Sequence, residues 1–214
     1  MGKILSIDSP LWMILNKITD TIVLSLLFIV TSVPIVTMGS SLCALYYMMF
    51  RIADNTECHI VRGYFKAFKE NFKKSTPVWL VCLLVGLVLA GDIYICVKMQ
   101  NAAAGFIMAA AGVIIVLYAM LVLYLFPLLA KCVGDTRQII FMAFMMSIKE
   151  WWRTLFMLFI TVIMFAVGVF VTAPFFMVAP GVIAMSHVYI FRTIFNKYGM
   201  KEDEKICQSC QYRL

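Results

Sequence analysis

The chain has 214 residues, of which 64% are apolar and 14% are charged, and its net charge is +7. Soluble domains are about half apolar and about a quarter charged, and a chain of this length cannot bury so much apolar surface in one core. The composition excludes an ordinary soluble enzyme, a disordered chain and a nucleic-acid binder, and it predicts an all-α, polytopic integral membrane protein.

Long segments without any charged residue mark the predicted membrane spans; they are 21–50, 75–91, 99–130 and 154–191. A helix of about 20 apolar residues crosses the hydrocarbon core. The second and third segments therefore predict one span each. The last segment is long enough for two spans that turn between Pro174 and Pro180. With the N-terminal region counted as two spans, we expect about six.

Residues 11–53 fit two helices with a break between them. In the first, 11–31, Lys17 and Asp20 lie one helical turn apart and can pair, which lowers the cost of charge near the membrane. Pro34 then ends this helix, and residues 38–53 form a shorter span. The same residues also fit a re-entrant hairpin, which would reduce the number of full crossings.

The candidate helix-break motif consists of Pro34 together with Gly39 and Ser40. Gly39-Ser40-Ser41 begins the second predicted helix directly after the break. Free N–H groups at a helix N-terminus can bind an anion or a substrate oxygen. We favour the simpler interpretation, a compact extracellular turn.

The next loop predicts an amphipathic helix over 61–72, followed by a turn at Pro77 into the third span. Its residues recur at spacings of three and four, as a helix requires. The apolar stripe is Val61, Phe65, Phe68 and Phe72, and the basic stripe is Arg62, Lys66, Lys69 and Lys73. Such a helix can rest on membrane lipid, the role that we favour, or dock a cytoplasmic partner.

The second long loop repeats this plan. Its apolar stripe, which runs into the fifth span, is Ile140 or Phe141, Phe144, Ile148 and Trp152. The pattern F-x-A-F begins at both Phe65 and Phe141, which suggests a weak repeat of span, surface helix and span. Trp151 and Trp152 are predicted anchors at the membrane interface.

Lysine and arginine concentrate in the two long loops and near the C-terminal end. The positive-inside rule therefore places both loops and both termini in the cytoplasm. We divide the chain into a transmembrane helical domain, 1–198, and a cytoplasmic tail, 199–214. Cys207 and Cys210 in the tail have the spacing of half a zinc site or a redox pair, but the two further ligands that zinc needs are not close in sequence.

The sequence contains none of the familiar catalytic motifs. Walker A, H-E-x-x-H and G-x-S-x-G patterns do not occur. Acidic residues are scarce within the predicted spans, which argues against a proton-coupled pump. We predict a non-enzymatic protein with no catalytic residue, no cofactor and no metal.

Three stretches resemble a known family. They are DTIVLSLLF from Asp20, VPIVTMGSSLCALYY from Val33 and GYFKAFKENFK from Gly63. Together they are similar to the YesL-like family of small bacterial membrane proteins of undefined function. The resemblance is strong over residues 1 to about 80 and rests on length and span pattern beyond them. Family members often carry asparagine where this chain has Ser25.

The resemblance implies a companion of carbohydrate-uptake ABC importers in the plasma membrane of a Gram-positive bacterium. We therefore expect a multi-pass auxiliary subunit whose partners are membrane lipids and the permease or ATPase subunits of the importer. One alternative is a stand-alone small-molecule permease or facilitator. Another is a membrane-anchored sensor that uses Cys207 and Cys210.

Overall fold

The computed structural model describes residues 10–56, 59–98, 102–132, 136–171 and 173–198, and almost all of these residues are helical. An apolar environment favours helices because each helix satisfies its own backbone hydrogen bonds. In chain order the elements are α1 (Pro10–Ser32), the short 3-10 helix η1 (Ile35–Thr37), α2 (Met38–Ala53), α3 (Ile60–Lys98), α4 (Ala102–Lys131), α5 (Thr136–Lys149), α6 (Trp151–Val171) and α7 (Ala173–Tyr198).

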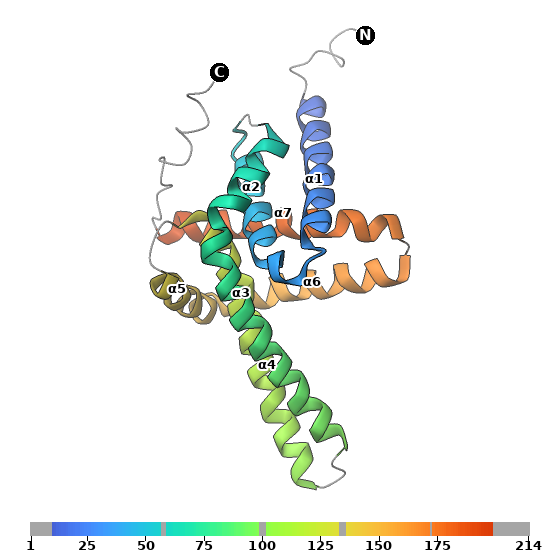
Figure 1. The fold of residues 1–214 in the computed structure, drawn as a ribbon, viewed down its shortest axis with the longest axis vertical. Coiled ribbons are helices and arrows are strands. Elements are labelled where there is room, and N and C mark those ends of the chain that lie inside the picture. The colour runs from blue at the N-terminus through green and yellow to red at the C-terminus, as the bar shows by residue number, and fades with distance from the viewer. Residues whose placement is uncertain (1–9, 57–58, 99–101, 133–135, 172, 199–214) are drawn as a thin grey trace.

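The helices meet around α2, which contacts α1, α3, α4 and α7 (Figure 1). The long helices α3 and α4 lie side by side, and their pair extends well beyond the end of α2. The pair of α6 and α7 runs across the direction of α1. Six helical segments of the described chain are long and apolar enough to cross a membrane. The predicted all-α polytopic fold is therefore confirmed.

The region before the third span differs from the sequence prediction. Residues 61–72 do not form a separate surface helix but the first part of α3, and Pro77 lies inside that helix rather than at a turn. Contacts with neighbouring helices compensate for the backbone donor that an interior proline lacks. On both sides of Pro77 the helix is held by buried residues, among them Ala67 and Val78. The second loop does contain a separate helix, α5.

The turn between the last two spans also lies elsewhere than predicted. α6 ends at Val171 and α7 begins at Ala173, so Pro174 and Pro180 both belong to α7. Proline is well tolerated in the first turn of a helix, where its missing N–H has no intrahelical partner. This explains why Pro174 begins a helix here instead of separating two.

Large side chains fill the core between α2, α4 and α7. Met48, Met49, Tyr124, Phe126 and Phe191 are among the most deeply buried. These side chains form a closely packed core where the helices converge. This packing holds the two long pairs in fixed positions relative to α2.

Two glycines allow the closest helix contacts. A Cβ atom on Gly39 of α2 would lie 2.5 Å from Cβ of Trp79 and 3.0 Å from the carbonyl oxygen of Ser75, both on α3. A Cβ atom on Gly181 of α7 would collide with Ser25 of α1. Small residues at such positions let helix backbones approach closely.

Candidate functional site

The predicted docking residues lie on the N-terminal half of α3, and they do not share one environment. Phe65 and Phe72 are 42% and 38% exposed. Phe68 is partly buried and packs against the core. Lys69 and Lys73 are exposed, and Lys66 is half-buried. The accessible part of this surface therefore combines two phenylalanines with two lysines.

A third side of α3, which its apolar and basic stripes did not reveal, faces the core. Its buried residues include Gly63, Tyr64, Ala67 and Ser75. The Tyr64 hydroxyl lies 2.6 Å from the Thr31 hydroxyl at the end of α1. The presence of small residues four apart, such as Gly63 and Ala67, was the signal in the sequence. This third side is the buried one, and the accessible residues are Phe65, Phe72, Lys69 and Lys73.

The helix-break motif forms a compact turn that is bonded to α3. α1 ends at Ser32, just before Pro34, and the Trp79 indole N–H donates to the Ile35 carbonyl at 2.7 Å. The Ser40 hydroxyl accepts a hydrogen bond from Ser75 at 3.0 Å. Together with the close approach at Gly39, these bonds show that the start of α2 serves a helix–helix contact.

A buried polar centre lies where α2, α6 and α7 meet. His187 is fully buried, with its Nδ1 3.0 Å from the Tyr46 hydroxyl. Its Nε2 lies 3.3 Å from the Met157 carbonyl oxygen and 3.2 Å from the Thr161 hydroxyl. A neutral ring that carries its proton on Nε2 donates to that carbonyl and accepts from Tyr46, which satisfies both nitrogens.

No motif in the sequence predicted this polar centre. Its signal was the position of His187, the only histidine within the charge-free segment 154–191. The spacing of the sequence could not show that Tyr46, on a helix far away in the chain, supplies its partner. In the structure the histidine links three helices, as buried and hydrogen-bonded polar groups commonly do.

Charged residues are paired at the ends of the same helices. Glu150, which is 8% exposed, accepts from Lys197 at 2.5 Å and forms an ion pair with Arg153 at 3.1 Å. Arg192 pairs with Asp54 at 2.7 Å. These contacts tie the end of α7 to the start of α6 and to the end of α2. A buried carboxylate requires such partners.

The second apolar stripe is exposed rather than buried. Phe141, Phe144 and Ile148 point away from the core, and α5 packs on its neighbours through its other side, which includes Ile139 and Ala143. Within the part of the chain that the structure describes, no group of three metal-ligating side chains could hold an ion. The tail with Cys207 and Cys210 lies outside the described residues.

Residues 21–93 match a family whose description reads "Protein of unknown function, DUF624". This is the YesL-like family, so the resemblance seen in the sequence is confirmed over this region, which runs from the middle of α1 through most of α3. No curated protein and no solved structure matches the chain.

Proposed function

We propose that the chain, whose residues 21–93 belong to the DUF624 (YesL-like) family, is a non-enzymatic membrane companion that docks a cytoplasmic protein. More specifically, we propose an auxiliary subunit of a carbohydrate ABC importer. The observation that carries the docking role is the exposure of Phe65 and Phe72 beside Lys69 and Lys73 on α3. The choice of importer rests on the family resemblance alone.

The shape of this surface supports a protein partner. A helix that only rests on lipid turns its apolar side to the membrane and its charges to water. Here the core occupies one side of α3, and Phe65 and Phe72 remain exposed next to lysines. Aromatic side chains are enriched at the centres of protein interfaces, and charges around them give specificity. A partner with an apolar groove rimmed by carboxylates would fit this surface.

The packed centre supports a companion rather than a stand-alone permease. A permease or facilitator needs a polar path through its helices. The large side chains of Met48, Met49 and Tyr124 are fully buried at the point where α2, α4 and α7 converge. This dense apolar packing leaves the outer surface as the place for interaction.

Purification of the tagged chain from its native membrane in mild detergent tests the proposal. We expect permease or ATPase subunits in stoichiometric amounts. Phe65→Ala combined with Phe72→Ala should release them, because the anchors are lost while the buried side of α3 is unchanged. The control is Phe159→Ala with Phe165→Ala, which removes two phenylalanines of α6 that are 60% and 63% exposed.

Two results would contradict this proposal. The first is a Phe65/Phe72 double variant that inserts normally and keeps every partner, which would end the docking role. The second is sugar transport by the purified chain alone in liposomes, which would favour the permease. Phe68 is not substituted in the double variant because it packs against the core, and its truncation would also lower stability.

The cytoplasmic orientation has its own test at Cys132, which is partly exposed just after α4. In a variant that keeps Cys132 as its single cysteine, a membrane-impermeant thiol reagent should label inverted vesicles. Intact cells should remain unlabelled. Labelling of intact cells would place this junction outside and remove the basis for a cytoplasmic partner.

A further inference from the structure

The exposed side of α5 is apolar along almost its whole length. Between Arg137 and Lys149, which lie near the two ends of this described helix, Gln138 is the only exposed polar residue. The other exposed side chains of this stretch are Ile140, Phe141, Phe144, Met145 and Ile148. The opposite side of α5 is apolar too, and it packs on the protein. A helix that is apolar on both sides is covered by protein or by lipid, and such a surface rarely faces water.

The length of α5 does not allow it to cross a membrane. Its 14 residues extend over about 21 Å, whereas the hydrocarbon core is about 30 Å thick. α5 is accordingly not among the six segments of the described chain that are long and apolar enough to cross. A short apolar helix of this kind can lie in the plane of the membrane, at the boundary between headgroups and acyl chains.

The junction between α5 and α6 bends the chain. α5 lies at the end of the α6–α7 pair where α6 begins, and only Glu150 separates the two helices (Figure 1). The Thr154 hydroxyl lies 3.3 Å from the carbonyl oxygen of Ser147, seven residues earlier. In a straight helix, residues seven apart are separated by about 10 Å along the axis, so this contact requires a bend. The Thr154 hydroxyl also lies 3.1 Å from the Tyr124 hydroxyl, which holds the bend against α4.

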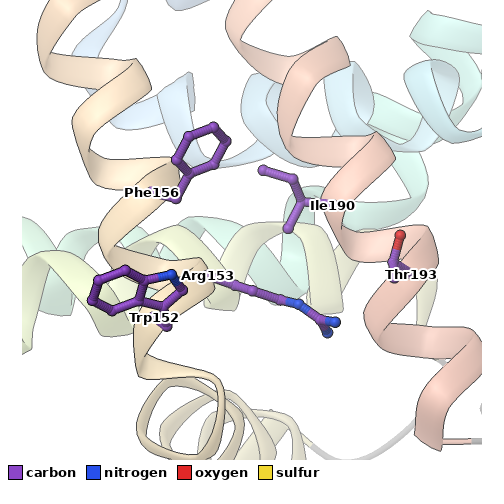
Figure 2. Close-up of a pocket in the computed structure, with 5 residues that line it drawn as sticks. All are labelled: Trp152, Arg153, Phe156, Ile190 and Thr193. Atoms are coloured by element: carbon purple, nitrogen blue, oxygen red, sulfur yellow. The ribbon is translucent and has the colours of Figure 1, made fainter.

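The exposed apolar surface of α5 continues onto α6, a candidate membrane span. Ile148 at the end of α5 and Trp152 at the start of α6 are both exposed, Trp152 by 73%. Figure 2 shows Trp152 and Phe156 on α6, where they line a groove together with Arg153 and with Ile190 of α7. The exposed side of a span contacts lipid, and indole rings favour the headgroup region. This continuity favours lipid, rather than a protein, as the cover of α5.

The charged residues of α5 fit the same position. Arg137 and Lys149 are exposed near the two ends of the helix, from which long side chains can extend to lipid headgroups. On α3, by contrast, Lys69 and Lys73 are interspersed with the exposed phenylalanines. The exposed aromatic residues of α5 can therefore enter an apolar layer without taking a cation with them.

We propose that α5 lies in the plane of the membrane, with Phe141, Phe144 and Ile148 among the acyl chains and with Arg137 and Lys149 at the headgroups. The leaflet is the one at which α6 begins, the side that the positive-inside rule makes cytoplasmic. The bend after α5 then sets the depth at which α6 enters the bilayer. This surface is separate from the docking surface on α3 and does not depend on it.

Photocrosslinking of the full-length chain in its native membrane tests the proposal. Benzoylphenylalanine replaces Phe141, and mass spectrometry of the irradiated protein identifies the adduct. We expect phospholipid adducts in a yield comparable to that of the same probe at Phe159, on the exposed side of α6. The polar control is Thr56, which is exposed in the turn after α2 and should give no lipid adduct. A crosslink from position 141 to another protein or to a second copy would overturn the proposal, as would the absence of any adduct there while Phe159 yields one.

A second design changes the surface while the buried side of α5 stays intact. With the probe at Phe144, Phe141→Asp should lower the yield of lipid adducts, because a carboxylate in the apolar layer is costly and moves the helix toward water. Phe141→Leu is the matched control and should keep the yield. The probe at Phe159 should label equally in both backgrounds, which shows that α6 still inserts. Equal lipid labelling at Phe144 in the aspartate and leucine variants would contradict the in-plane position.

Discussion

α2 and the outer half of the α3–α4 pair are both apolar enough to cross a membrane, yet they occupy opposite environments. In α2, 12 of 16 residues are buried by other helices. In the outer half of α3, Leu84 and Leu87 are 63% and 65% exposed. Hydrophobicity therefore identifies both as spans but does not tell which one faces protein. Hydroxyl-bearing residues such as Ser40 and Ser41 mark the buried side of α2, because they can bond across helices. Glycine alone does not mark a helix contact, since a Cβ atom on Gly91 of α3 would meet no atom within 4 Å.

The largest difference in stability should come from replacing one leucine with alanine in each of the two regions. Leu45→Ala on α2 removes a side chain that is 1% exposed and leaves a cavity, at a cost of about 2–5 kcal/mol. Leu87→Ala on α3 should change stability by less than about 0.5 kcal/mol, because its side chain contacts lipid or detergent before and after unfolding. Unfolding in mixed micelles of mild detergent and dodecyl sulfate would measure both. Equal losses would show that the outer pair is covered by protein.

Replacing a glycine with alanine in each region should give a smaller difference in stability, and the two changes should have opposite signs. Gly39→Ala places Cβ against Trp79 and should destabilise by about 1–3 kcal/mol. Gly91→Ala meets no atom within 4 Å of the new Cβ, so it should stabilise α3 by about 0.5–1 kcal/mol through helix propensity. The same micelle titration measures both variants. A neutral Gly39→Ala would contradict the close α2–α3 contact.

Removal of a single hydroxyl should have the smallest effect. Tyr46→Phe takes the bond from His187 Nδ1 and leaves a buried acceptor unpaired, at a cost of about 1–2 kcal/mol. Tyr94→Phe, on a side chain that is 63% exposed, should be neutral within about 0.5 kcal/mol. Thermal unfolding in detergent is sensitive enough for this comparison. An unchanged transition for Tyr46→Phe would show that water or another group replaces the tyrosine.

The N-terminal half of α3 shows what residue spacing in the sequence can and cannot predict. The spacing of Phe65, Phe68 and Phe72 correctly indicates a helix, but it does not reveal that this helix continues through Pro77. Local rules favour a break at proline. Packing of Ala67 and Ser75 against the rest of the protein decided otherwise. The roles of the aromatic and basic residues stay predictions, since a helix face can be accessible for lipid or for protein.

The sequence by itself determined the membrane class, the all-α fold, the number of candidate spans and the family of residues 21–93. These follow from charge-free length and from local motifs, which need no knowledge of distant contacts. Only the tertiary structure decided that α2 is central, that His187 meets Tyr46, and that Arg153 lines a groove with Ile190. Each of these pairings joins residues far apart in the chain, and no periodic pattern specifies which face of one helix meets which face of another.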